Sequence, residues 1–125
     1  MTHLFDSDVI ISQLNDKYIL AIVPELPPAM SVITYGELLY GIKKSKSPKK
    51  QKQLDGLLDD LHMVILPITE AIIKRFITIK LLMETGGEKL ADFDLLIAAT
   101  AIEHNLTLIT GNKKHFQRIK GLTLA

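Results

Sequence analysis

The chain has 125 residues, 47% of them apolar, and a formal net charge of +1. Its length predicts one domain over residues 1–125, its apolar content excludes long-range disorder, and its net charge gives no support for a nucleic-acid partner. Cysteine is absent, which excludes disulfides and thiolate metal sites.

The sequence shows no signal for a membrane or for export. No apolar run approaches the roughly 20 residues that cross a bilayer. The opening residues, MTHLFDSDVIIS, lack the charged and apolar regions of a signal peptide. We therefore expect a cytoplasmic protein with no membrane partner.

The first half of the chain predicts two strands and three helices. Residues 3–5 (HLF) form the first expected strand, and a helix is expected to open with VIISQL, at residues 9–14. Three of the five prolines fall within residues 24–30 and break regular structure there. A second strand is expected over residues 31–33 and a helix from 34. Pro48 suits the first turn of a further helix, whose apolar face carries Leu54, Leu57, Leu58 and Leu61.

The second half continues the alternation. Residues 63–68 (MVILPI) are the third expected strand. Apolar residues at near-helical spacing predict a helix over residues 69–85, which the glycines at 86 and 87 end. A helix over residues 92–104 then leads to a fourth strand at 106–110, and residues 122–124 are a candidate fifth strand. This pattern predicts a single α/β domain with a central parallel sheet of four or five strands and helices on both faces.

Oxygen-bearing side chains lie beside the predicted strand ends. In parallel α/β sheets the working site lies at the carboxyl ends of the strands. Four separate segments bring such side chains to that edge, namely Asp6 with Asp8, Glu37, Asp92 with Asp94, and Thr110 with Asn112.

Most of these acids also have a purely structural explanation. Thr34 and Glu37 form the T-x-x-E pattern of a capping box. Asp92 is a suitable N-cap, after which Asp94 would interact favourably with the helix dipole. Asp8 is one of two residues able to cap the first helix.

Asp6 is harder to explain by capping, because it lies between two apolar runs and needs a partner there. Three or more carboxylates at one sheet edge repel one another, so that without a cation at least one pKa would rise. Mg²⁺ or Mn²⁺ removes this conflict, because both prefer oxygen ligands, and such a site supports attack of water on a phosphodiester. The histidines lack ligand spacing and are expected at the surface or an edge: His3, His62, His104 and His115.

Three stretches of the sequence match motifs that occur together in one known family. LFDSDVIISQL (4–14) is similar to an opening Asp-Thr-Asn-Val-Leu-Ile motif, and SVITYGELLYGI (31–42) to an Ile-Ser-x-x-Thr-x-x-Glu-Leu-x-x-Gly block. DLLIAATAIEHNLTLITGNKKHFQRIKGLTL (94–124) is similar to the C-terminal block of the same family. In this order, and over nearly the whole chain, the stretches resemble the PIN-domain ribonucleases, and more narrowly the VapC-type toxins of type II toxin–antitoxin modules.

The resemblance implies an endoribonuclease that depends on Mg²⁺ or Mn²⁺ and hydrolyses RNA phosphodiester bonds. Asp6, Glu37 and Asp94 match the three acids of the family and would hold the metal. Asp92 falls just outside the matched block and is expected to cap the helix or to support the site. The resemblance also implies a cognate antitoxin protein and a homodimer.

The chain departs from the family pattern after the fourth strand. Asn112 stands where many members have a fourth acid, and it offers a carbonyl oxygen without a charge. We expect it to assist catalysis, with Thr110 supporting the site. Asp8 stands where asparagine is common, and it either restores part of the missing charge or hydrogen-bonds the loop.

Two basic clusters are candidates for contact with RNA phosphates, although either could be an ordinary solvated surface. The second cluster follows the fourth strand, and we favour it because Asn112 places it beside the acids. The first could equally flank a groove for an antitoxin peptide. The first cluster is Lys43, Lys44, Lys46, Lys49, Lys50 and Lys52, and the second is Lys113, Lys114, Arg118 and Lys120.

Two other functions stay open at this point. A phospho-accepting receiver domain shares the α/β order and the acids after the first strand. It also needs an aspartate at the end of the third strand, which here reads LPITE. The other alternative is a catalytically weak PIN-like scaffold that only binds a protein partner, which the neutral Asn112 leaves open.

Overall fold

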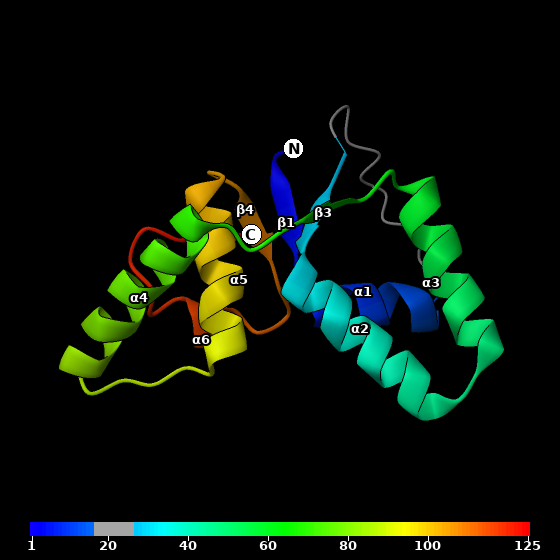
Figure 1. The fold of residues 1–125 in the computed structure, drawn as a ribbon, viewed down its shortest axis with the longest axis horizontal. Helices are drawn as coiled ribbons and strands as arrows, with labels where there is room; N and C mark the ends of the chain where they lie inside the picture. The colour runs from blue at the N-terminus through cyan, green and yellow to red at the C-terminus, as the bar shows by residue number, and fades with distance from the viewer. Residues whose placement is uncertain (17–26) are drawn as a thin grey trace.

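The computed structural model describes residues 1–16 and 27–125, which form one five-stranded sheet with helices packed on both faces (Figure 1). In this described part of the chain, no helix is long and apolar enough to span a membrane. The elements in chain order are β1 (His3–Phe5), α1 (Ser7–Asp16), β2 (Ala29–Ser31), α2 (Val32–Ser45), α3 (Pro48–Asp60), β3 (Val64–Leu66), α4 (Glu70–Thr85), α5 (Asp92–Glu103), β4 (Thr107–Ile109), α6 (Lys113–Phe116) and β5 (Thr123–Leu124).

The sheet is parallel throughout, with the strand order β3-β2-β1-β4-β5. The chain runs outward from β1 to β3 and then returns to the other side of β1 to add β4 and β5. The direction of winding therefore reverses between β1 and β4, and such a reversal opens a crevice at the carboxyl ends of the two strands. The predicted parallel α/β sheet is confirmed, with five strands.

Alternate strand residues enter two separate cores, one on each face of the sheet. Leu4 and Leu108 pack with α4 and α5, whereas their neighbours Phe5 and Ile109 pack with α1, α2 and α3. Figure 1 shows α4 and α5 on one side of the molecule and α1, α2 and α3 on the opposite side. Because both faces are covered, the central residues of β1, β2 and β4 are fully buried, namely Leu4, Met30 and Leu108.

The boundary between β2 and α2 differs from the prediction. The Ser31 side chain accepts a hydrogen bond from the Ile33 amide at 3.1 Å and caps a helix that begins at Val32. The expected strand at 31–33 is therefore wrong, and β2 ends where that strand was expected to begin. Of the expected break at 24–30, residues 24–26 lie outside the described part, and Ala29 begins β2.

Helices α3 and α4 begin as their sequences predict. Pro48 is the first residue of α3, where its missing N–H costs no hydrogen bond. The Thr69 side chain caps α4 by accepting from the Ile72 amide at 3.2 Å. One helix, α6, was not predicted, because four residues are too few to show a helical period.

Candidate active site at the carboxyl edge of the sheet

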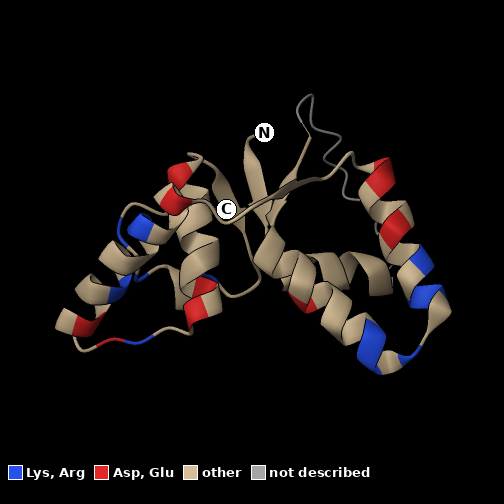
Figure 2. Cartoon of the chain, viewed as in Figure 1, with Lys and Arg blue, Asp and Glu red and all other residues tan. Residues whose placement is uncertain are grey.

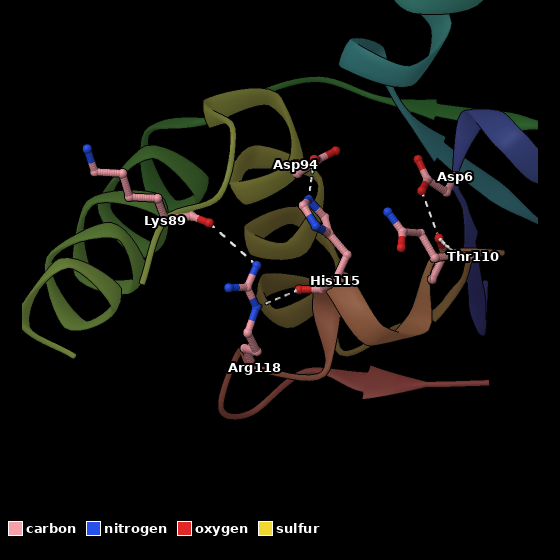
Figure 3. Close-up of polar contacts among 7 residues, drawn as sticks. Asp6, Lys89, Asp94, Thr110, His115 and Arg118 are labelled. Carbon is pink, nitrogen blue, oxygen red and sulfur yellow. Dashed lines mark hydrogen bonds and ion pairs between the residues drawn. The ribbon is translucent and has the colours of Figure 1, made fainter. Parts of the chain in front are cut away.

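Asp6 stands directly after β1, with only 7% of its surface exposed. One carboxylate oxygen, Oδ1, accepts from the Ser7 amide at 2.8 Å, and the other, Oδ2, accepts from the Thr110 hydroxyl at 2.9 Å (Figure 3). Thr110 reaches Asp6 because the register pairs Phe5 of β1 with Ile109 of β4. The buried carboxylate thus has the partners that its apolar setting requires.

Thr110 also connects Asp6 to the loop that carries Asn112. Its hydroxyl oxygen accepts from the Asn112 amide at 3.0 Å, and the threonine is 4% exposed. Asn112 itself is exposed at the N-cap position of α6, where its side chain makes no capping hydrogen bond. The threonine therefore fixes both the first acid and the start of the loop after β4.

Asp8 also forms a hydrogen bond with the loop after β4. Its Oδ2 accepts from the Gly111 amide at 3.0 Å, and a Cβ atom at position 111 would lie only 2.7 Å from that oxygen. A larger residue at position 111 would push the Asp8 carboxylate away from the Gly111 amide. The charge of Asp8 also raises the pKa of Asp6. The predicted hydrogen bond of Asp8 to the loop is therefore present, and its contribution of charge to a metal site stays a prediction.

Asp94 lies in the first turn of α5 and contacts a histidine. His115 Nε2 and Asp94 Oδ2 are 2.9 Å apart, and both side chains are about one-third exposed (Figure 3). The His115 ring packs edge-on against Phe116, and its backbone carbonyl accepts from Arg118 at 3.4 Å. His115 was expected at the surface or an edge, and its contact with an acid was missed. Its place three residues after Asn112 is the signal that could have revealed the contact.

Asp92 takes a different direction from Asp94. The N-cap of α5 is Ala91, which makes no side-chain hydrogen bond, so the predicted capping role of Asp92 is wrong. Its carboxylate instead pairs with Lys80 of α4 at 2.9 Å. Two positions along an α-helix correspond to a rotation of roughly 200°, so Asp92 is directed toward Lys80 of α4 and Asp94 toward His115.

Glu37 lies in the second turn of α2. Because the helix begins at Val32 and its first turn carries no acid, the predicted capping box with Thr34 is wrong. Loss of hydration, followed by the charges of Asp6 and Asp94, raises the pKa of Glu37. Glu37 therefore does not cap α2. Its carboxylate lies in the electrostatic field of Asp6 and Asp94.

The three predicted acids form one electrostatic cluster. Burial raises the pKa of Asp6, its hydrogen bonds to Thr110 and Ser7 oppose that rise, and Asp8 and Asp94 add to it. Among residues 1–16 and 27–125, no group of three or more histidine or acidic side chains is close enough to hold an ion as it stands. The donors are nevertheless oxygen atoms on mutually repelling carboxylates, which is the type of ligand that Mg²⁺ or Mn²⁺ prefers.

The first basic cluster lies at the junction of α2 and α3 (Figure 2). Lys50 of this cluster lines a groove of about 240 Å³ between α1, α2 and α3, together with Ile11, Leu14 and Glu37. The groove is largely apolar, and Glu37 joins it to the acidic cluster.

The residues of the second basic cluster differ in their contacts. Lys113 and Lys114 are exposed on α6, close in sequence to Asn112. Arg118 instead donates to the carbonyl of Lys89 at 3.4 Å and lies 3.9 Å from the Glu88 carboxylate. The arginine thus fastens the loop before α5 to the segment after α6.

Comparison with known proteins assigns this arrangement to one family. Residues 4–122 match the PIN domain family. Ribonuclease VapC1 of Methanocaldococcus jannaschii is 36% identical over 117 residues, which cover 94% of this chain and 80% of the relative. Ribonuclease VapC2 of Rickettsia felis is 37% identical over 97 residues, which cover 77% and 71% of the two chains.

Solved structures give the same result. The crystal structure of VapBC2 from Rickettsia felis, bound to a DNA fragment from its promoter, contains a chain that superposes with a TM-score of 0.91 at 28% identity. The match covers 100% of this chain and 98% of that one. VapBC-1 from nontypeable Haemophilus influenzae superposes with a TM-score of 0.80 at 26% identity and covers 100% and 97%. None of these similarities favours the receiver-domain alternative.

Proposed function

This chain belongs to the PIN domain family, and to the VapC-type ribonucleases within it, and from that membership we propose that it is a metal-dependent endoribonuclease, the toxin of a toxin–antitoxin pair. Its relatives carry the name ribonuclease, and its structural neighbours include VapBC complexes. The substrate class is RNA, cut at internal phosphodiester bonds.

One observation carries this proposal. Asp6, Glu37 and Asp94 come from the end of β1, from α2 and from α5, and each of Asp6 and Glu37 has its pKa raised partly by charges of the other segments. A fold does not gather like charges at one sheet edge for stability, because their repulsion costs free energy. Binding of a divalent cation explains the arrangement.

The proposed roles follow from the contacts. A bound Mg²⁺ or Mn²⁺ would activate water and offset charge on the scissile phosphate. Asp6 and Asp94 would hold that ion, and Glu37 would complete the set of ligands or orient the attacking water. Thr110 keeps Asp6 in place through the 2.9 Å hydrogen bond, and Asn112 assists from the adjoining loop.

Two further chemical contacts complete the proposal. His115 fixes the direction of the Asp94 carboxylate. Lys113 and Lys114 are exposed beside the site and contact RNA phosphates, which position the strand without reading its sequence. Arg118 was predicted to do the same, and in this structure its guanidinium already has intramolecular partners.

The antitoxin is proposed to occupy the groove between α1, α2 and α3. That groove is apolar along Ile11 and Leu14 and carries Lys50 and Glu37 at its polar positions. An amphipathic segment with an apolar face and a basic residue fits this lining, because the basic residue would pair with Glu37 and neutralise one of the three acids. Occupation of the groove would therefore inhibit cleavage.

A homodimer is also proposed. Helix α4 exposes Ile73, Ile77, Leu81 and Leu82, although most of its remaining apolar residues are buried. An exposed apolar stripe of this kind is typical of a contact surface. The mass of the protein in solution, measured for the parent chain and for Ile77→Asp, tests whether this stripe forms the dimer contact.

The central experiment is a cleavage assay on mixed RNA with Mg²⁺, with and without EDTA. We expect internal cleavage that EDTA abolishes and added Mn²⁺ or Mg²⁺ restores. Asp94→Asn should bind no metal tightly and cut no RNA, while its circular dichroism spectrum stays unchanged. Full cleavage in EDTA would refute the metal-dependent mechanism, and absence of cleavage with metal and without antitoxin would favour the protein-binding scaffold.

A further inference from the structure

A second groove borders the acidic cluster on the other side of Glu37. It has a volume of about 610 Å³ and is lined by Val32, Ile33, Gly36, Glu37, Tyr40 and Phe93. Five of these residues belong to α2, and Phe93 belongs to the first turn of α5, which packs against α2. The volume lies within the range of about 300–1,000 Å³ that is usual for small-ligand sites.

The two aromatic residues of this groove are exposed in a way that core packing does not explain. Tyr40 is 69% exposed and Phe93 is 55% exposed. Phe5 and Phe116 are almost completely buried, and Tyr35 packs against a core. Within residues 1–16 and 27–125, Tyr40 and Phe93 are the only phenylalanine or tyrosine residues with large exposed surfaces, and both line the same groove.

The groove shares one residue, Glu37, with the proposed catalytic acids. Glu37 is one of its lining residues, and Phe93 precedes Asp94 directly in the chain. A ligand that contacts Phe93 and Tyr40 therefore lies beside the position proposed for the scissile phosphate.

The charge at the rim indicates the class of ligand. Lys44 Nζ lies 5.8 Å from the centroid of the Tyr40 ring, and Lys43 and Lys44 are both exposed in the last turn of α2. Aromatic surfaces next to lysines suit a ligand that carries flat bases and phosphates in alternation, which is single-stranded nucleic acid. A purely apolar protein segment would gain nothing from the charge of Lys44 beside the Tyr40 ring.

We propose that this groove binds one unpaired nucleobase of the RNA substrate beside the scissile phosphate, through contact with Phe93 and Tyr40, while Lys44 contacts the next phosphate along the strand. The inference rests on the proposed ribonuclease function and adds two aromatic residues, Phe93 and Tyr40, that contact the base next to the cut. Bases inside a double helix are stacked on each other and are not free to enter such a groove.

The test measures binding separately from cleavage. The probe is a short single-stranded RNA in which 2-aminopurine replaces every adenine, and EDTA in the buffer prevents metal-dependent cleavage. We expect the parent protein to quench the 2-aminopurine fluorescence. Phe93→Leu and Tyr40→Leu should each bind about tenfold more weakly and quench less, because loss of one base–aromatic contact has an effect of this order. Phe93→Trp should restore both properties.

A matched control comes from α4. Phe76→Leu is the same chemical change at another aromatic residue that also has a lysine, Lys80, at 5.8 Å from its ring, but Phe76 packs against the core outside the groove. It should bind the probe like the parent protein, and binding of the same RNA as a duplex should not depend on Phe93. Thermal unfolding verifies that every variant is folded.

Each outcome decides the inference. Parent-like binding and quenching by Phe93→Leu and Tyr40→Leu would overturn it, even if the parent protein cleaves RNA. A change of molecular mass in place of RNA affinity would also overturn it and would assign the groove to a second copy of the chain. Lost binding in these variants, with no cleavage by the parent protein in Mg²⁺, would support the groove and refute the proposed catalytic function.

Discussion

Replacing Thr110 by valine removes one hydroxyl from the candidate site with little change of shape. That hydroxyl donates to Asp6 Oδ2 at 2.9 Å and accepts from the Asn112 amide at 3.0 Å. A hydrogen bond to a charged group contributes about 1.5–3 kcal/mol and a neutral one about 0.5–1.5 kcal/mol. Their loss should lower the free energy of unfolding by about 2–4 kcal/mol at neutral pH. For a chain of this length the Tm should fall by roughly 10 °C.

The loss should depend on pH in a defined direction. Burial raises the pKa of Asp6 in the folded protein, and the Thr110 hydrogen bond opposes that rise, so Thr110→Val should raise this pKa further. The folded variant then holds its proton to higher pH than the folded parent does. Its stability deficit should therefore increase as pH rises through the folded-state pKa of Asp6 and should be smaller at pH 4 than at pH 8.

The assay is urea unfolding of the metal-free protein at these two pH values. Thr100→Val is the matched control, because Thr100 is fully buried and donates to the Leu96 carbonyl at 2.7 Å, with no carboxylate as its acceptor. Its deficit should be the same at both pH values. Equal deficits at pH 4 and pH 8 for Thr110→Val would refute the claim that its hydroxyl stabilises the ionised form of Asp6.

Three other predictions concern the same edge of the sheet. Asp94→Asn should abolish cleavage with an unchanged fold, whereas Asp92→Asn should reduce cleavage less than twofold, and equal losses in a cleavage time course would contradict the separation of the two acids. Gly111→Ala should lower the free energy of unfolding by about 1 kcal/mol, since its Cβ would lie 2.7 Å from Asp8 Oδ2 and displace that oxygen from the Gly111 amide, and the same change should cost less in a chain that carries Asp8→Ala. Asn112→Asp should tighten Mn²⁺ binding several-fold, measured by electron paramagnetic resonance, because it adds a fourth charge to the cluster.

The sequence predicted the fold class correctly because its signals are local and repeated. The apolar runs near residues 3–5, 63–68 and 106–110 contain strands β1, β3 and β4, and the helix start at Pro48 is where the sequence indicates it. Errors arose where two local rules compete. The stretch SVITYGEL is compatible with both a strand and a capping box. In the structure Ser31 is the N-cap of α2, because its hydroxyl reaches the Ile33 amide.

The sequence also indicated that Asp6, Glu37 and Asp94 lie at one edge, because parallel strands bring their carboxyl ends together. The hydrogen-bond partners of the aspartates could not be predicted from the sequence. Thr110 lies 104 residues from Asp6, and Gly111 lies 103 from Asp8, so these contacts depend on the pairing of β1 with β4. The contact of His115 with Asp94 likewise depends on how α6 packs beside α5.

The groove lined by Tyr40 and Phe93, and the exposure of both rings, depend on the tertiary structure alone. In the sequence both residues lie in apolar helices, where an aromatic side chain is expected to be buried. Helical periodicity gives the direction of a side chain relative to its own helix, but exposure depends on which neighbouring helix covers it. Here α2 and α5 approach each other without closing over these rings, and only that packing leaves two aromatic surfaces beside the acids.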